Sequence, residues 1–195
     1  KFLHQHCILH RDLKPGNVIL DERLYPRIID FGLSKFFEPG KVASITKQCG
    51  TPIYMAPEVI EDNVYNEKTD VYAFGILMYE VVTDQIPYPP YQRGDMADYK
   101  FKKNVIEKDY RPVFSIDVKK SIQELIELCW SKEPKKRPTF SELFDKLTSN
   151  NKKSIHDFYS ENEEEEEEEE NDIKNDHEEN FKYFLDDVDI QKVQE

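Results

Sequence analysis

Three side chains near the start of the chain have the types and the spacing that phosphoryl transfer requires. Asp12, Lys14 and Asn17 stand close together beside a Pro-Gly pair, which is typical of a loop. A carboxylate can accept a proton from an attacking hydroxyl group, and an ammonium group can neutralise charge on the phosphoryl group. A carboxamide oxygen can bind Mg²⁺. The three side chains therefore form a candidate site for phosphoryl transfer.

A short β-hairpin is expected to position these side chains. The apolar runs Val18–Leu20 and Arg27–Ile29 flank a polar turn at residues 21–26, and this pattern predicts two antiparallel strands. Such a hairpin brings Asp30, which follows the second strand, close to Asn17. A hairpin of this size can therefore bring Asn17 and Asp30 to one metal ion.

Several dispersed motifs, in the right order, resemble those of eukaryotic protein kinases. The octet His-Arg-Asp-Leu-Lys-Pro-Gly-Asn at residues 10–17 resembles the family's catalytic loop, and Asp-Phe-Gly at residues 30–32 resembles its metal-binding motif. The run Gly50–Glu58 resembles the end of its activation segment. We call residues 10–17 the catalytic loop and residues 33–58 the activation segment. The resemblance covers residues 1–148 and implies a mainly α fold with a short β-hairpin (α+β), as in the carboxy-terminal lobe of a kinase.

The resemblance implies ATP and Mg²⁺ as cofactors and a protein serine or threonine as the phosphate acceptor. It makes Asp12, Lys14 and Asn17 the catalytic residues. Nucleotide binding would fall to Lys14, Asn17, Ile19 and Asp30, with Ile19 against the adenine ring and Asn17 and Asp30 as the metal ligands. Lys14, two residues after the catalytic Asp, resembles serine/threonine kinases, while the run Asp-Val-Tyr-Ala-Phe-Gly at residues 70–75 resembles the tyrosine-kinase-like group.

The resemblance also assigns supporting roles outside the reacting groups. His10 and Phe31 would pack beneath the metal-binding carboxylate, and Asp70 would bond back to the catalytic loop. Glu58 would form a buried ion pair with Arg137. Loss of one partner of such a pair leaves an uncompensated charge and costs roughly 3–5 kcal/mol.

The activation segment is expected to carry a switch. Thr51 would bond towards the catalytic loop, and Arg11 resembles the arginine that grips an activating phosphate. Thr46 is our first candidate for that phosphorylation site and Ser44 our second; the plain alternative is that both are ordinary loop hydroxyl groups.

Helical periodicity predicts the remaining elements. Apolar residues on nearly every face predict a buried helix from Thr69, as its N-cap, to about Val82. Weaker patterns predict helices at roughly 92–103 and 117–130, and a last one at Ser141–Thr148. Residues 1–9 are expected to form the last turns of a helix that begins upstream. Trp130 is expected to be a packing anchor.

The net charge of -13 comes entirely from the end of the chain. Residues 1–150 hold 22 Lys+Arg and 22 Asp+Glu, whereas residues 151–195 hold 5 and 18. The balanced part offers no broad basic surface, so we expect neither nucleic acid nor membrane as a partner. The glutamate run at residues 163–170 predicts a disordered acidic tail at 149–195. A short amphipathic helix is predicted within it at 181–190. The tail is expected to be a solvated spacer, and recruitment of a basic partner is the alternative.

The three cysteines, at positions 7, 49 and 129, are odd in number and lack metal-ligand spacing. This favours a reducing compartment, and we expect the cytoplasm, with the nucleus as the alternative.

We expect the chain to be a fragment that lacks the amino-terminal kinase lobe. Its six glycines include no Gly-x-Gly pair, and no run resembles Val-Ala-Ile-Lys. Small-molecule phosphotransferases related to aminoglycoside kinases share the loop but lack the run Thr51–Glu58. Two readings therefore stay open: part of an active serine/threonine kinase, inactive when isolated, or a non-catalytic binding or scaffold module derived from a kinase lobe. The retained Asp12, Asn17 and Asp30 favour the first.

Overall fold

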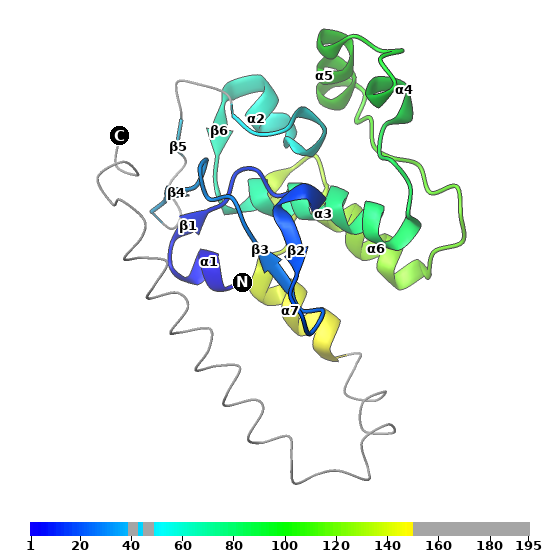
Figure 1. Cartoon of the computed structure of the whole chain (residues 1–195). Helices are drawn as coiled ribbons and strands as arrows, with labels where there is room; N and C mark the ends of the chain where they lie inside the picture. Colours follow the sequence, from blue (N-terminus) through cyan, green and yellow to red (C-terminus); the bar gives the residue numbers. More distant parts are fainter. Residues whose placement is uncertain (39–42, 45–48, 150–195) are drawn as a thin grey trace, which may run out of the picture. The chain divides into compact units, whose positions relative to one another are not determined.

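The computed structural model describes residues 1–38, 43–44 and 49–149 (Figure 1). The chain divides into two compact units, Lys1–Phe140 and Ser141–Glu195. Every described residue of the candidate site belongs to the first unit. The predictions on the acidic tail, its amphipathic helix and Thr46 lie outside the described residues.

Helices hold far more of the described residues than strands do, as the mainly α expectation requires. The α-helices of the described part are α1 (Phe2–Gln5), α2 (Pro57–Asp62), α3 (Glu67–Thr83), α4 (Pro89–Gln92), α5 (Asp98–Glu107), α6 (Lys120–Cys129) and α7 (Phe140–Ser149). Three short 3₁₀ helices accompany them, each beginning at a proline: η1 (Pro15–Asn17), η2 (Pro52–Tyr54) and η3 (Pro134–Lys136). None of the described helices is long and apolar enough to cross a membrane.

Three two-stranded antiparallel sheets are present in the described part. They pair β1 (Ile8–Leu9) with β4 (Lys35–Phe36), β2 (Val18–Leu20) with β3 (Pro26–Ile28), and β5 (Ala43–Ser44) with β6 (Val64–Tyr65). The β2–β3 pair is the expected hairpin, although its second strand begins one residue earlier than predicted. The sequence did not predict the other two sheets, because strands of two residues are too short to show an alternating pattern.

Helix α3 is the longest element and runs through the centre of the first unit (Figure 1). The predicted N-cap Thr69 is wrong. The cap is Asn66, whose side-chain oxygen accepts a hydrogen bond from the Lys68 amide at 2.8 Å. Thr69 lies inside the first turn instead, and its hydroxyl donates to the Asn66 carbonyl at 2.7 Å. An asparagine side chain satisfies a free amide at a helix start as well as a threonine does.

The core forms where α3 packs against α6. Gly75 permits the close approach, because a Cβ atom there would lie 2.9 Å from the Cβ of Cys129. Trp130 is a buried packing anchor, as predicted, and its ring contacts those of Tyr79 and Phe114. The expectation that α3 is buried on nearly every face fails at its end, where Val81 is 70% exposed.

Two predicted helices differ from the observed ones. Residues 92–103 do not form one helix, because α4 ends before Gly94, which has a positive φ of 82°, and α5 starts only at Asp98. Residues 1–9 form just the short α1, since Cys7 adopts a φ of 59° and the chain then enters β1. Helices α6 and α7 agree with the predictions to within three residues at each end.

Candidate active site

Asp70, in the first turn of α3, holds the backbone of the catalytic loop. Its Oδ2 accepts a hydrogen bond from the His10 amide and its Oδ1 one from the Arg11 amide, both at 2.9 Å. Arg11 has a φ of 66°, an unfavourable conformation for a residue with a side chain, and these bonds help to hold it there. The link from Asp70 to the catalytic loop, expected from the resemblance, is therefore present.

A histidine that the sequence reading did not single out completes this anchor. His4 Nε2 lies 2.8 Å from Asp70 Oδ2, although the two residues are 66 positions apart. Burial of Asp70 raises the pKa of its carboxyl group, but the hydrogen bonds from His4, His10 and Arg11 outweigh burial, and the pKa is lowered. Asp70 is therefore held as a carboxylate, which is the form that accepts all three hydrogen bonds.

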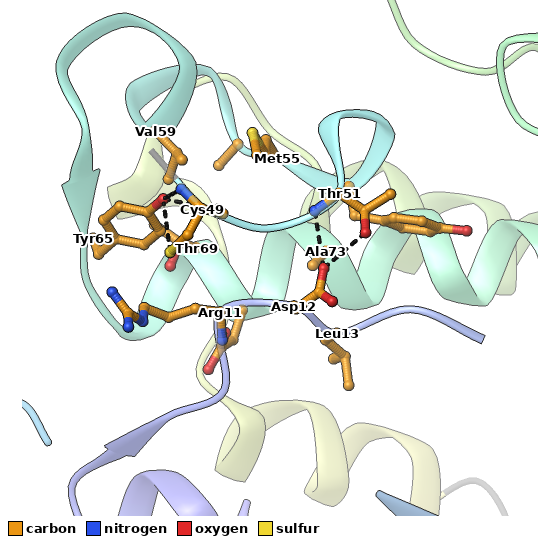
Figure 2. Close-up of a pocket in the computed structure, with 13 residues that line it drawn as sticks. Arg11, Asp12, Leu13, Cys49, Thr51, Met55, Val59, Tyr65, Thr69 and Ala73 are labelled. Atoms are coloured by element: carbon orange, nitrogen blue, oxygen red, sulfur yellow. Dashed lines mark hydrogen bonds between the residues drawn. The ribbon is translucent and has the colours of Figure 1, made fainter. Parts of the chain in front are cut away.

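The carboxylate of Asp12 is the centre of a hydrogen-bond network (Figure 2). Its Oδ1 accepts from the Thr51 amide at 2.9 Å and from the Thr51 hydroxyl at 2.8 Å. Its Oδ2 accepts from Lys14 Nζ at 2.7 Å and from Asn17 Nδ2 at 3.2 Å. Lys14 Nζ also donates to the Thr51 hydroxyl at 2.9 Å. The fold thus brings together the three predicted catalytic residues and the threonine expected to bond to them.

The same contacts set the charge of Asp12. Burial raises the pKa of this carboxyl group, but the hydrogen bonds from Lys14 and Thr51 lower it by more, so its pKa lies below the ordinary value. Asp12 is therefore a carboxylate at neutral pH and a weak base. Such a group is suited to orienting a hydroxyl group and receiving its proton as the oxygen becomes acidic during the reaction.

The hairpin brings the two predicted metal ligands towards each other. The Ile29 amide donates to the Asn17 carbonyl at 2.9 Å, and Val18 pairs with Ile28, so Asp30 follows the strand beside Asn17. Asp30 is exposed, and its Oδ1 accepts from the Gly32 amide at 3.2 Å.

This donor set fits magnesium. Asn17 Nδ2 donates to the Asp12 carbonyl at 2.8 Å, which directs the amide nitrogen towards Asp12 and leaves its oxygen for a metal. Mg²⁺ usually takes one or two protein ligands and completes its shell with water and substrate phosphates. Within the described ranges there is no cluster of three His, Cys, Asp or Glu side chains that would form an all-protein metal site.

Two of the residues expected to support the metal-binding segment contact each other. The rings of His10 and Phe31 pack edge to face with centroids 5.3 Å apart. His10 Nε2 also lies 3.2 Å from the Ile29 carbonyl oxygen, which precedes Asp30. Ile19, expected against the adenine ring, is 49% exposed on β2 and is available for such a contact.

Short strands hold the activation segment near its start and near its middle. Strand β4 near its start pairs with β1, and the Arg11 Nε–H donates to the Leu33 carbonyl. Ser44, a predicted phosphorylation site, belongs to β5, whose backbone pairs with Val64 in β6. Thr51 and η2 then lead into α2, where Glu58 pairs with the buried Arg137.

Tyr65 also bears on the site, and the sequence analysis missed it. Its hydroxyl donates to the Cys49 carbonyl at 2.9 Å and accepts from the Cys49 amide at 3.0 Å (Figure 2). No local signal could have identified this contact, because Tyr65 lies in a two-residue strand and its partner is 16 positions away.

Comparison with known protein families shows to which family the chain belongs. The family model described as "Protein kinase domain" matches residues 1–147. The chain belongs to the protein kinase family. It is 34% identical over 179 residues to dual specificity protein kinase shkA of Dictyostelium discoideum, an alignment that covers 91% of this chain and 32% of that kinase.

Other kinases show the same relation. The dual specificity protein kinase shkC of Dictyostelium discoideum is 39% identical over 149 residues, or 75% of this chain and 29% of that protein. The serine/threonine-protein kinase STY17 of Arabidopsis thaliana is 34% identical over 146 residues, or 75% of this chain and 24% of that protein. The chain thus spans about a third or less of the length of these kinases.

Proposed function

We propose that the chain forms the carboxy-terminal lobe of a serine/threonine protein kinase, and that the whole protein transfers the γ-phosphate of ATP to protein hydroxyl groups. The observation that carries this proposal is the Asp12 carboxylate, held on one oxygen by Thr51 and on the other by Lys14 and Asn17. This arrangement places a carboxylate that can accept a proton beside an ammonium group and a carboxamide, the groups that phosphoryl transfer with Mg²⁺ uses.

In this proposal each side chain has one task. Asp12 accepts a hydrogen bond from the acceptor hydroxyl, orients its oxygen towards the phosphoryl group and takes its proton. Lys14, whose Nζ lies 2.7 Å from Asp12 Oδ2, is placed to neutralise charge on the transferred phosphoryl group. Asn17 and Asp30 would hold Mg²⁺. When bound, this ion offsets the negative charge of the phosphates.

The acceptor and the regulation follow from neighbouring residues. The names of the related kinases include both serine/threonine and dual specificity enzymes, and the position of Lys14 favours serine and threonine as acceptors. A phosphate on Thr46 or Ser44 would order the activation segment by pairing with Arg11, which already donates to the Leu33 carbonyl in that segment. We place this activity in the cytoplasm.

The experiment uses the natural protein that contains this chain, with ³²P-labelled ATP. Three peptides that differ only in a central Ser, Thr or Tyr serve as acceptors, with Mg²⁺ or with excess EDTA. We expect label on the Ser and Thr peptides, little on the Tyr peptide, and none in EDTA. Absence of transfer to all three peptides with Mg²⁺ present would instead support a non-catalytic binding module.

A further inference from the structure

The hydroxyl of Tyr65 binds both backbone groups of a single residue. It donates to the carbonyl oxygen of Cys49 at 2.9 Å and accepts from the amide nitrogen of Cys49 at 3.0 Å. The Cys49 Sγ also lies 3.6 Å from the same oxygen. Figure 2 shows these bonds converging on the tyrosine from the end of the activation segment. Tyr65 itself is only 2% exposed, so water does not compete for the contact.

The rest of Tyr65 joins two further segments to this contact. The Arg11 guanidinium carbon lies 5.4 Å from the centre of the Tyr65 ring, within the range of a cation–π interaction. The backbone of Tyr65 pairs with Ala43 in the β5–β6 sheet. One side chain and its backbone therefore connect the catalytic loop with the activation segment at two points.

The chain between Cys49 and the catalytic aspartate leaves little room for adjustment. Gly50 has a φ of 106°, and a Cβ atom there would lie 2.7 Å from the Arg11 carbonyl oxygen. The next residue, Thr51, donates both of its hydrogen bonds to Asp12 Oδ1. The position of the Cys49 backbone therefore determines where Thr51 meets Asp12.

We propose that Tyr65 is a positioning residue for phosphoryl transfer, because its hydroxyl holds the Cys49 backbone and so keeps Thr51 on Asp12. The proposal rests on the function proposed above and adds a residue that touches neither nucleotide nor acceptor. Burial raises the pKa of Tyr65 to about 12, so its hydroxyl remains a donor at neutral pH.

The first test is amide hydrogen exchange in the full 195-residue chain, comparing Tyr65→Phe with the parent. The matched control is Tyr79→Phe, since Tyr79 is also buried and its hydroxyl donates to the Val113 carbonyl at 3.0 Å. Loss of two hydrogen bonds predicts exchange at Cys49 and Thr51 that is about tenfold faster in Tyr65→Phe. The control should leave those two amides unchanged. Parent-like exchange at Cys49 in Tyr65→Phe would overturn the proposal.

The second test is steady-state phosphate transfer by the natural protein that contains this chain. For Tyr65→Phe we expect kcat to fall about tenfold while KM for ATP is unchanged, because nucleotide contacts remain. The Tyr79→Phe control should keep the kcat of the parent, because the hydroxyl it loses bonds to Val113 and not to the activation segment. Dividing the rate by the folded fraction, measured by circular dichroism, removes any effect of stability alone.

The outcomes separate this proposal from the proposed function. Faster exchange at Cys49 together with a parent-like kcat would overturn the positioning role. A parent protein that transfers no phosphate would overturn the proposed function, and the positioning role would fall with it. Faster exchange and a lower kcat, both absent from Tyr79→Phe, would support the positioning role.

Discussion

Arg137 and Glu58 are 79 positions apart in the chain, yet the two terminal nitrogens of the Arg137 guanidinium donate to the two oxygens of the Glu58 carboxylate, at 2.6 and 2.8 Å. The arginine is 1% exposed, and its remaining donors reach the carbonyl oxygens of Ser131, Lys68 and Lys132. The pair fixes α2, at the end of the activation segment, to the C-cap residue of η3.

Removing one partner of this pair is expected to be costly. Glu58→Gln leaves the Arg137 charge buried without a counter-charge, which predicts a loss of about 3–5 kcal/mol in the free energy of unfolding, measured with urea. The control is Glu133→Gln, which removes the exposed ion pair with Lys136 at 2.7 Å and should cost about 1 kcal/mol or less. Equal losses in the two variants would contradict this role for the buried pair.

The lowered pKa of Asp70 predicts how the free energy of unfolding depends on pH. Its pKa is lower in the folded chain than the ordinary value of about 4 because hydrogen bonds from His4, His10 and Arg11 outweigh burial. Its carboxylate therefore stabilises the fold above that ordinary pKa, and this contribution is lost as the pH falls through the lower, folded pKa.

The measurement is urea unfolding of the parent chain and of Asp70→Asn between neutral pH and the acid limit of folding. We expect the difference between their unfolding free energies to be large at neutral pH and to shrink as the solution becomes acidic. Asp117→Asn, at an exposed position, is the control and should follow the parent. If the difference instead grew towards low pH, the Asp70 carboxylate would not stabilise the fold at neutral pH.

The substitution Gly75→Ala tests how closely α3 packs on α6. Alanine favours a helix over glycine by about 1 kcal/mol, but the added Cβ would lie 2.9 Å from the Cys129 Cβ and 3.2 Å from the Trp130 amide nitrogen. We expect the steric cost of the added Cβ to exceed the gain in helix propensity. Gly75→Ala should then lower the melting temperature, with a net cost of about 1–2 kcal/mol. Gly16→Ala, where the nearest atom is 3.9 Å away, should have a smaller effect. A more stable Gly75→Ala chain would contradict the close approach.

The 195-residue chain by itself is expected to transfer no phosphate. Kinase catalysis depends on the positions and charges of all the groups around the phosphates. A site that has only some of these groups is therefore not partly active. Asp12, Lys14, Asn17 and Asp30 supply one wall of the site, whereas the six glycines of the chain include no Gly-x-Gly pair to cover the phosphates. Circular dichroism would establish folding, and ³²P transfer above that of the same chain with Asp12→Asn would contradict this expectation.

Local sequence patterns predicted the parts of the site that are close in the chain. The loop at residues 10–17 and the hairpin that brings Asp30 beside Asn17 depend on neighbouring residues, whose turn and strand signals are readable. The contacts of Asp12 with Thr51, and of Glu58 with Arg137, were expected only from the resemblance to kinases, because each joins distant segments.

Contacts without a local signal were missed. His4 on Asp70 and Tyr65 on Cys49 use common residue types in short elements, so nothing in their surroundings distinguishes them from packing residues. The start of α3 was misplaced for a simpler reason. Both Asn66 and Thr69 are good N-caps, and only the fold shows that Asn66 is the one that accepts the free amide.

The most direct test of the central claim is single-turnover phosphate transfer by the natural protein with Asp12 replaced by Asn. This change keeps the shape of the side chain and removes its ability to accept a proton. We predict a fall of about 100-fold or more in the transfer rate, with Mg·ATP affinity nearly unchanged and with Asp117→Asn behaving like the parent. Transfer by the Asp12→Asn protein at the parent rate would contradict the assignment of Asp12 as the catalytic carboxylate.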